Sequence, residues 1–481
     1  MYIQNYSQLI SESLNRNSLE LRKIGLKSLE IAIKSVEPRK LIRNAIKITD
    51  EILIIEEDKY DLKKFERIII IGGGKATAQM AIALDELLRT YSKIEYKGFL
   101  NIPEDQELKF LNSTKNIKMN LASHPIPNEA GLNGVNKMLE LIEGTNKEDL
   151  IICLFSGGGS ALLPLPKKNI SLADIQKINS LLLASGASIH EINTIRKHIS
   201  DFKGGNLAKR IYETSKATTV TILISDVVGN KLDSIASGPT IPDLTSFSDA
   251  YEALLKYDLL DMIPFPAKEV IMEGVKNPQL ENPSKNDPVF ENVHTYLIGS
   301  VEFSVEEVSN YLRKHNFEID CFSNEISGEA ADFGKELYYL IAEKLREYAK
   351  EPKKLRIAMI GTGELTVTLR GKGIGGRNQE MLLNFLNIIK SKKIDYNFFV
   401  FGCNLDGIEG NSKAMGALVD NDILMETIND DVNIDSYLRD NNSNAFFNLL
   451  KGEIITGPTG INVNDIIMSL VELNDERIVE K

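Results

Sequence analysis

Apolar residues follow two different spacings along this chain, and the spacing changes after about residue 60. From Ser18 to Val36, apolar side chains recur every three or four positions, which predicts an amphipathic helix. A second helical segment is predicted from Pro38 to Ile48, because proline is favoured in the first turn of a helix. We therefore expect the first sixty residues to be helical.

Beyond this region, short β-branched segments alternate with helical ones. Six such segments stop at Gly, Ser or Asp: Ile68–Ile71, Leu150–Phe155, Thr218–Ile224, Thr295–Ile298, Ile357–Ile360 and Phe398–Phe401. Alternating strands and helices predict an α/β protein with a mostly parallel sheet. Ligands bind such sheets beyond the carboxyl ends of the strands, so the small and polar residues that follow these segments are candidates for the site.

The length of 481 residues suggests two or three domains. Prolines are concentrated between Pro239 and Pro288, which predicts a break in that part of the chain. We place the boundary after residue 245. Residues 1–245 are then expected to form an N-terminal Rossmann-like domain with the mostly parallel sheet, and residues 246–481 a second α/β domain.

Composition restricts the class of partner. A net charge of −12 argues against nucleic acid, because its binders carry basic faces. No apolar segment approaches the ~20 residues of a membrane span, and the N-terminus lacks the apolar core of a signal peptide. Three widely spaced cysteines predict neither a disulfide framework nor a zinc site. We expect a cytoplasmic protein, monomeric or homodimeric, without nucleic-acid or membrane partners.

Two glycine-rich turns follow predicted strands. Gly72–Lys75 precedes a predicted helix, and Ser156–Ser160 is the second turn. Small residues let the backbone N–H groups approach a phosphate, and Lys75 adds a positive charge. Ala76 after the lysine excludes a Walker A loop, and Thr77 replaces the third glycine of a dinucleotide fingerprint. A plain tight turn is the alternative for each. The candidate phosphate-binding residues are Gly73, Gly74, Ser156, Gly157, Gly158, Gly159 and Ser160.

Further polar candidates lie between these turns and the predicted break. Asn193 and Arg196 are three positions apart and share one face if their segment is helical. We expect Lys197 to be a solvated basic residue, and His198 to be either structural or functional. Asp226 follows the strand at 218–224 and is placed to hold Mg²⁺, or alternatively to cap a helix.

The segment Gly371–Glu380 contains four glycines and two cations before a predicted helix. Such a loop is predicted to be mobile and to close over an anion, with a flexible hairpin as the alternative. Arg377 at its base has the fork of donors that binds a carboxylate or phosphate. The asparagine-rich segment Asp440–Asn448 is predicted to be a loop or cap.

Taken together, these segments resemble the class II glycerate 2-kinases with a C-terminal MOFRL domain. The resemblance covers nearly the whole chain, in the order of that family. The matching segments are Gly74–Ala76, Ser123–Gly131, Ser156–Pro164, Asn193–His198, Ser225–Gly229, Ile235–Thr240, Gly373–Glu380 and Thr456–Asp465.

The resemblance implies transfer of the γ-phosphoryl group of ATP, with Mg²⁺, to the 2-hydroxyl of D-glycerate, giving 2-phosphoglycerate and ADP. It implies that the active site lies in a cleft between two α/β domains and that Lys75 and Arg377 are catalytic. As exposed cations they should contribute little to stability. Asn193 and Arg196 are expected at the substrate and Asp226 at the metal. Glu364 and Asp406 are further candidates for the site.

Three alternatives to this function remain open. They are a kinase for another small hydroxy acid, an oxidoreductase of the hydroxypyruvate reductase type, and a non-catalytic small-molecule-binding relative. Departures from the family pattern are concentrated in the second half of the chain. They include Val301, Glu409, Lys413, Asn442 and Asn444.

Overall fold

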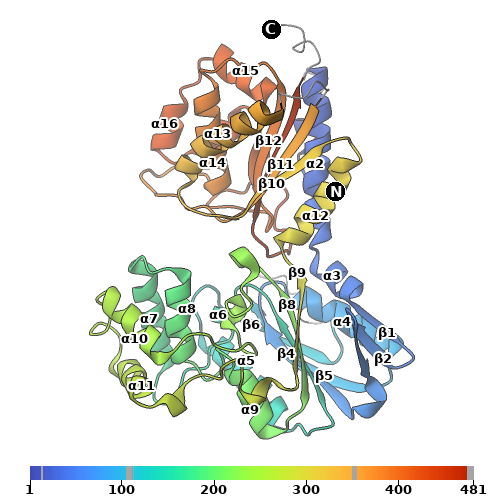
Figure 1. The fold of residues 1–481 in the computed structure, drawn as a ribbon, viewed down its shortest axis with the longest axis vertical. Helices are drawn as coiled ribbons and strands as arrows, with labels where there is room; N and C mark the ends of the chain where they lie inside the picture. The colour runs from blue at the N-terminus through green and yellow to red at the C-terminus, as the bar shows by residue number, and fades with distance from the viewer. Residues whose placement is uncertain (12–14, 105–110, 112, 349–354, 474–481) are drawn as a thin grey trace. The chain divides into compact units, whose positions relative to one another are not determined.

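The computed structural model describes residues 1–11, 15–104, 111, 113–348 and 355–473, and it divides into two compact units (Figure 1). One unit is Pro38–Gly299. The other combines Met1–Glu37 with Ser300–Lys481. This division differs from the predicted boundary after residue 245: residues 1–37 join the C-terminal part of the chain, and residues 246–299 stay with the preceding part.

The N-terminal residues join the C-terminal part through a helix and an ion pair. Helix α2 (Arg16–Ser35) follows the short α1 (Tyr6–Leu9). A Cβ atom at Gly25 in α2 would lie 2.0 Å from the ring of Phe399, so the helix packs directly on that residue's strand. Arg22 Nη2 lies 2.6 Å from Asp420 Oδ2, and both side chains are buried. Sequence spacing carries no sign of a pairing between residues so far apart.

The unit Pro38–Gly299 contains a six-stranded sheet in the order β6-β5-β4-β7-β8-β9. Every neighbouring pair is parallel, which confirms the predicted α/β class and parallel sheet. The strands are β4 (Arg67–Gly73), β5 (Glu95–Pro103), β6 (Ile117–Ala122), β7 (Leu150–Phe155), β8 (Thr218–Ile224) and β9 (Val293–Gly299).

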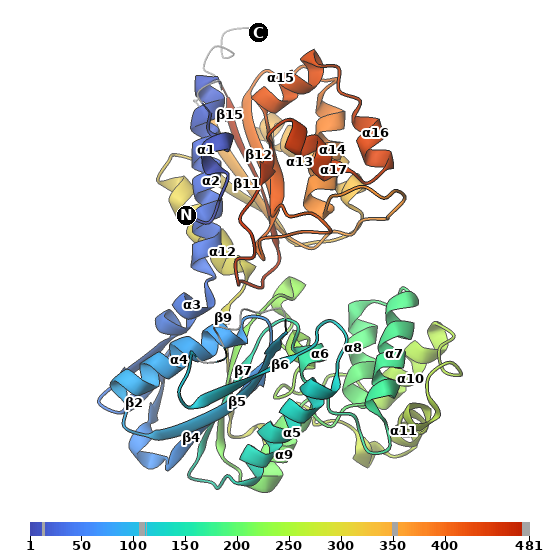
Figure 2. The same cartoon turned by 180° about the vertical axis from the view of Figure 1, so that it is seen from behind.

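Helices cover this sheet, and a further group of helices forms a second core in the same unit. Alternate strand residues, including Ile69 and Ile71, form one core with Val135 of α5 (Glu129–Glu143) and Leu207 of α9 (Asn206–Thr214). Helix α4 (Thr77–Tyr91) packs beside β5 and β7 of this sheet (Figure 2). A second core surrounds Phe247 and draws residues after 245 into this unit. Its helices are α7 (Leu172–Ala184), α8 (Ile189–His198), α10 (Phe247–Lys256) and α11 (Phe265–Lys276).

Residues 46–61 are not helical, so that prediction was wrong. Helix α3 ends at Ala45 (Pro38–Ala45), and β1 (Ile46–Thr49), β2 (Ile52–Ile55) and β3 (Asp58–Asp61) form an antiparallel sheet. Buried and exposed side chains alternate along β1, a period of two that suits a strand. A turn at Asp50 and Glu51, both with positive φ, reverses the chain into β2.

The other unit contains a mixed six-stranded sheet in the order β10-β11-β15-β12-β13-β14. The pair β10–β11 is parallel and the remaining pairs are antiparallel. Its strands are β10 (Glu318–Ile326), β11 (Leu355–Gly363), β12 (Asn397–Asn404), β13 (Gly416–Asp420), β14 (Glu453–Ile454) and β15 (Asp465–Leu473). The expected strands at 357–360 and 398–401 are thus confirmed.

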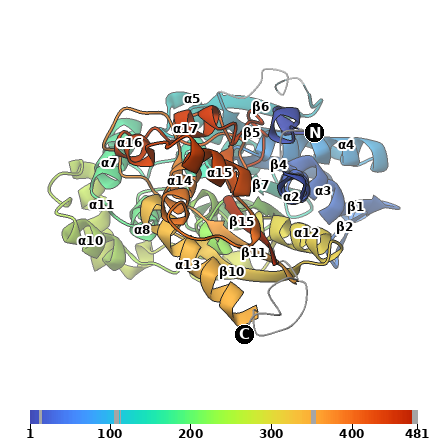
Figure 3. The ribbon, with the colours of Figure 1, turned by 90° about the horizontal axis from the view of Figure 1, so that it is seen from above.

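Helices pair on this second sheet. Helix α12 (Val301–Arg313) lies beside α2, and α13 (Ala330–Tyr348) lies beside α14 (Arg377–Ile389) (Figure 3). Three shorter helices follow in the chain: α15 (Asn421–Asn429), α16 (Ile434–Arg439) and α17 (Ser443–Leu449). Arg377 starts α14 and Asp465 starts β15, so both stand at element ends.

The three cysteines are all free, as predicted. Cys153 and Cys403 are buried and Cys321 is exposed. Burial raises the pKa of the Cys153 thiol, which keeps this sulfur protonated. Among the residues that the structure describes, none of the helices combines the length and apolar character needed to cross a membrane.

Candidate active site

The glycine-rich turn after β4 uses its N–H groups inside the protein. Gly74 N donates to Asn101 O at 3.3 Å, and Lys75 N donates to Gly157 O at 2.9 Å. Gly73 is the last residue of β4 and pairs with Asn101 and Phe155 of the adjacent strands. The turn therefore does not form the cradle of N–H donors expected of Gly74. What it can offer to a ligand is the half-buried Lys75 side chain.

Close contact between the two predicted turns explains the glycine at 74. Its φ is +152°, and a Cβ atom there would lie 2.2 Å from Ser156 Oγ. The Ser156 hydroxyl is fully buried and accepts a hydrogen bond from Ala76 N at 3.0 Å. It also lies 3.3 Å from Thr77 Oγ1. Ser156, a predicted phosphate-binding residue, thus fixes the beginning of α4 beside Lys75.

The turn Ser156–Ser160 has unused donors. In the part of the chain that the structure describes, the amides of Gly157, Gly158 and Ser160 make no hydrogen bond to protein. Gly158 has a φ of +79°, which favours glycine. Gly159 is equally constrained, because a Cβ atom there would lie 2.6 Å from Ala236 Cβ. This turn therefore retains the N–H groups that an anion requires.

Two side chains border these amides. A Cβ atom at Gly158 would lie 3.2 Å from Lys75 Cγ and 3.1 Å from His124 Cδ2. The Lys75 stem and the His124 ring therefore both flank Gly158. His124 was absent from the predicted site residues, although Ser123–Gly131 was one of the segments that match the family. The turn, the lysine and the histidine together form a site suited to a phosphate oxygen.

Ser160 connects this turn to a segment with unusual backbone conformation. Its Oγ lies 2.7 Å from Ser237 Oγ, and Ser237 Oγ donates to Asn193 Oδ1 at 3.4 Å. Ala236 and Ser237 both have positive φ, at +50° and +60°. Residues in this region cost about 1–2 kcal/mol each and are concentrated at functional sites. Ser237 was not among the predicted site residues, although it lies in Ile235–Thr240, one of the segments that match the family.

Asn193 and Arg196 lie on helix α8, so the condition for a shared face is met; the helix begins with a capping box between Ser188 and Glu191. Asn193 reaches the turn through Ser237. Arg196 Nε donates to Asn179 Oδ1 at 2.8 Å. The two predicted residues are thus brought to the region of Ser160.

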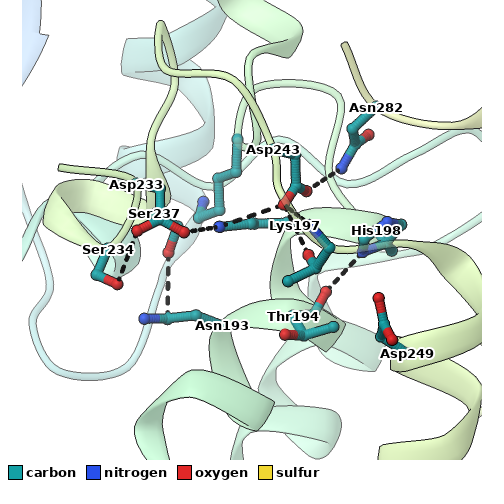
Figure 4. A network of polar contacts seen from close by, with 12 residues as sticks. Asn193, Thr194, Lys197, His198, Asp233, Ser234, Ser237, Asp243, Asp249 and Asn282 are labelled. Atoms are coloured by element: carbon teal, nitrogen blue, oxygen red, sulfur yellow. Dashed lines mark hydrogen bonds and ion pairs between the residues drawn. The ribbon is translucent and has the colours of Figure 1, made fainter. Parts of the chain in front are cut away.

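The prediction that Lys197 is a solvated residue was wrong. Its side chain is 2% exposed, and Nζ lies 2.7 Å from Asp233 Oδ2 and 3.3 Å from Asp243 Oδ1 (Figure 4). His198 is buried beside it, with Nδ1 2.8 Å from Thr194 O and its ring edge-on to Phe247. Both residues therefore stabilise the packing of α8 within this unit.

Asp226 follows β8, which lies next to β7 in the sheet, as β7 lies next to β4. Parallel order brings the carboxyl ends of these three strands to one edge. Asp226 is half-buried, and Val227 N donates to Ser225 Oγ at 3.1 Å in the same turn. Among the described residues no group of three or more His, Cys, Asp or Glu side chains could hold a metal ion. A single carboxylate fits Mg²⁺ only where phosphates and water supply the other ligands.

Arg377 forms two ion pairs at the start of α14. Nε donates to Asp465 Oδ2 at 2.6 Å and Nη2 to Asp465 Oδ1 at 2.8 Å. Nη1 donates to Glu364 Oε1 at 2.6 Å. The Asp465 side chain is 3% exposed, whereas that of Glu364 is 52% exposed. Asp465 thus fixes the guanidinium, and the third contact faces solvent.

Glu409, one of the departures from the family pattern, holds the same helix end. It accepts hydrogen bonds from Asn378 N and Gln379 N, both at 3.0 Å. Burial, with the nearby Asp465 charge, raises its pKa to about 7. Asp406, the other candidate of this region, lies in the turn after β12, where its carbonyl accepts from Thr459 N at 2.9 Å.

The glycine-rich loop before α14 makes hydrogen bonds to neighbouring segments, which argues against the expected mobility. Gly371 N donates to Asn441 Oδ1 at 2.9 Å, Gly373 N to Asp440 O at 2.8 Å and Gly375 N to Asn411 Oδ1 at 2.9 Å. A Cβ atom at Gly371 would lie 2.3 Å from Asp440 Cα, so glycine is needed here for close packing. Residues 440–442 of the asparagine-rich segment cap this loop, as predicted, but Ser443–Asn448, also expected to be loop or cap, lie in helix α17.

Two family models match the chain. Residues 26–272 match the model described as a domain of unknown function, DUF4147, and residues 357–465 match the MOFRL family. A protein of Pyrococcus horikoshii named glycerate 2-kinase is 34% identical over 94% of this chain and 98% of its own length. A protein of Agrobacterium vitis named putative hydroxypyruvate reductase is 31% identical over 84% of this chain and 87% of its own length.

The fold agrees with these matches. A crystal structure titled glycerate kinase, from Thermotoga maritima, aligns with a TM-score of 0.76 and 31% identity, covering 94% of this chain and 99% of that one. The fold and these matches together place the chain in the class of kinases. The chain belongs to the glycerate kinase family that carries a C-terminal MOFRL domain.

Proposed function

We propose that the protein transfers the γ-phosphoryl group of ATP to the 2-hydroxyl of D-glycerate, giving 2-phosphoglycerate and ADP. The hydroxyl oxygen forms a bond to the γ-phosphorus, the bond to the bridging oxygen of ADP breaks, and the hydroxyl proton is released. The observation that carries this proposal is the Lys75 side chain beside the unbonded amides of Gly157 and Gly158, in a chain of this family.

The geometry of the turn suits phosphoryl transfer. Catalysis of this reaction depends on positioning and on neutralising the charge spread over the phosphoryl oxygens. Lys75 supplies a charge, and the amides of Gly157, Gly158 and Ser160 supply fixed donors. Because Ser156 and Gly74 lock the two turns together, these groups are oriented before the substrate binds.

Arg377 is proposed as the second catalytic cation. Asp465 fixes Nε and Nη2, so the guanidinium plane has one orientation. The Nη1 partner is the half-exposed Glu364, whose carboxylate a phosphate oxygen can replace at small desolvation cost. Glu364 then occupies the position of the phosphate oxygen in the free protein. Asp465 keeps its contacts with Arg377 and positions the guanidinium.

Asp226 is proposed to hold Mg²⁺. When bound, the ion would neutralise phosphate charge and orient the nucleotide. Because the described residues contain no group of three metal-binding side chains, the nucleotide and water would supply most of the other ligands. An Asp226→Asn variant that keeps full activity with the same Mg²⁺ dependence would contradict this role.

The test of the reaction is phosphorus NMR of the product formed from ATP, Mg²⁺ and D-glycerate. We expect 2-phosphoglycerate, and a kcat lower by about 10²–10³-fold in Lys75→Met, the loss that follows removal of one transition-state donor. Lys97→Met, which alters an exposed lysine of the same unit, is the matched control. If wild-type protein whose fold has been confirmed forms no phosphorylated product, the proposal is wrong.

The alternatives give different results in the same preparation. Phosphorylation of other small hydroxy acids in place of glycerate would identify a kinase of different specificity. NADH oxidation with hydroxypyruvate would indicate the reductase named for the Agrobacterium relative, although Thr77 at the third glycine position argues against a dinucleotide turn. Ligand binding without turnover would indicate a non-catalytic relative.

A further inference from the structure

The buried Lys203 and the half-buried Arg196, next to the Ser156–Ser160 turn, have no carboxylate partner among the described residues. Lys203 is 5% exposed, and its Nζ donates to the carbonyl oxygen of Leu163 at 2.7 Å. Arg196 donates through Nε to the neutral side chain of Asn179. Neither cation forms an ion pair with any described residue. Two basic side chains therefore share one region of the unit, where their described partners are neutral.

Lys197 shows how the same unit accommodates another buried lysine. Its ammonium is paired with both Asp233 and Asp243 (Figure 4). Asn282 then donates to Asp243 Oδ2 at 2.8 Å and completes the network. An isolated buried ammonium costs several kcal/mol, and a partner charge offsets that cost. The missing partner of Lys203 is therefore a feature of this pocket and not of buried lysines in the protein.

Burial and the charge of Arg196 lower the pKa of Lys203 to about 7. The ammonium form is thus disfavoured in the free protein. An anion bound beside it would favour the charged form, as an opposite charge within a few ångströms does.

The pocket between these cations is small and mostly apolar. Its volume is about 20 Å³, and its walls include Pro127, Pro164, Leu165, Ile175 and Ile199. That volume holds one or two atoms of water size, which suits the oxygens of a carboxylate and is far too small for a nucleotide base. Apolar walls exclude water and strengthen the attraction between a bound anion and the cations.

Ser160 belongs both to this pocket and to the phosphate-type turn. It lines the pocket with Arg196 and Lys203, and its hydroxyl contacts Ser237. A molecule with a carboxylate in the pocket would therefore present its adjacent atoms to the turn. In a 2-hydroxy acid, the atom next to the carboxylate carries the hydroxyl that receives the phosphoryl group.

We propose that Lys203 and Arg196 form the subsite that binds the carboxylate of the hydroxy-acid substrate. This assignment rests on the proposed function for the identity of the substrate. It makes Lys203 a substrate-binding residue and restricts the substrate to short hydroxy acids with a free carboxylate. The Leu163 carbonyl holds the ammonium in place until the anion binds.

The test is calorimetric binding of D-glycerate and of its uncharged amide, glyceramide, to wild type, Lys203→Met and Arg196→Gln. We expect wild type to bind glycerate at least tenfold more tightly than glyceramide. Lys203→Met should lose most of that preference while its Kd for ATP stays the same. Lys168→Met, which alters an exposed lysine two positions after the pocket-lining Pro166, is the matched control and should retain the preference.

The outcomes separate the possible roles. If Lys203 only supports the Leu163 carbonyl, Lys203→Met lowers the melting temperature and weakens both ligands equally, which overturns the subsite. If Lys203→Met does not fold, equal binding of glycerate and glyceramide to wild type, or an unchanged preference in Arg196→Gln, overturns it instead. A wild type that binds none of a panel of small hydroxy carboxylates also overturns it.

Binding and turnover distinguish this inference from the proposed function. Glycerate binding that depends on Lys203, without phosphoryl transfer, supports the subsite and contradicts the kinase. Normal kcat/KM for glycerate in Lys203→Met supports the kinase and contradicts the subsite.

Discussion

Arg377 binds Asp465 through two parallel hydrogen bonds, from Nε to Oδ2 at 2.6 Å and from Nη2 to Oδ1 at 2.8 Å. Asp465 is buried, and Asn378 Nδ2 also donates to it at 2.8 Å. The sequence led us to expect that Arg377, as an exposed cation, contributes little to folding. The structure changes that expectation, because removal of Arg377 would leave a buried carboxylate without its counter-charge.

We therefore expect Arg377→Ala to lower the free energy of unfolding by about 3–5 kcal/mol, the usual effect of breaking a buried pair from one side. The double variant Arg377→Ala with Asp465→Asn should regain most of that stability, since the uncompensated charge is gone. It should not regain turnover, because the catalytic cation is still absent. Urea unfolding and kcat, measured on both variants, check the two parts separately.

Asp465→Asn alone is the control for the positioning role. It keeps the guanidinium but loosens its orientation, so kcat should fall while ATP binding changes little. Equal stability of Arg377→Ala and wild type, or recovery of kcat in the double variant, would show that the two residues do not act as described.

Ser156→Ala should destabilise the protein by about 1–2 kcal/mol. The variant leaves Ala76 N–H buried without its acceptor at the beginning of α4. Because Lys75 directly precedes that amide, kcat should fall as well. Ser180→Ala removes an exposed helical hydroxyl of the same unit and should stay within about 0.5 kcal/mol of wild type. An unchanged melting temperature in Ser156→Ala would contradict the assigned contact.

The sequence was sufficient to predict the parallel sheet because its strands are local signals. Short segments of apolar and β-branched residues such as Leu150–Phe155 and Thr218–Ile224 are followed by small or polar residues, and both are strands with the predicted bounds. The turns after β4 and β7 were located for the same reason. Their chemistry was only partly predicted, since the use of the Gly74 amide depends on a contact with a strand outside its own segment.

Ion pairs between residues far apart in the sequence could not be predicted from residue spacing. Arg22 and Asp420 are separated by 398 positions, and Lys197 reaches aspartates 36 and 46 positions away. A charged residue on a helix looks solvated until its partner is known, which is why Lys197 was misjudged. For the same reason the sequence did not single out Lys203. The pocket around it forms only in the folded protein, and the described residues that line this pocket include no carboxylate.

The loop before α14 should be protected from hydrogen exchange, because its amides are bonded to Asp440, Asn441, Asn442 and Asn411. We expect Asn441→Gly to increase exchange at Arg370 and Gly371 about fivefold, the effect of losing roughly 1 kcal/mol per bond. Glycine retains the positive φ of residue 441, so the variant removes the side chain without straining the backbone. Amides of β12 serve as the internal control. Fast exchange of the loop in wild type would restore the mobile loop expected from the sequence.

The pKa of Lys203 predicts a pH dependence of stability with a definite sign. In the unfolded chain the lysine titrates near 10.5, whereas in the folded protein burial and Arg196 lower its pKa to about 7. Between these values the unfolded state binds more protons, so the free energy of unfolding contributed by this group rises as pH increases from 7 to 10. Below pH 7 both states are protonated and the contribution is constant.

The difference in urea midpoint between wild type and Lys203→Met, measured at several pH values, isolates the contribution of Lys203, because methionine does not titrate. Arg196→Gln should move the rise to higher pH, since one of the two causes is removed. A difference that is flat, or that falls from pH 7 to 10, would mean that Lys203 remains fully charged in the folded protein, and an anionic partner inside the chain would then have to be found.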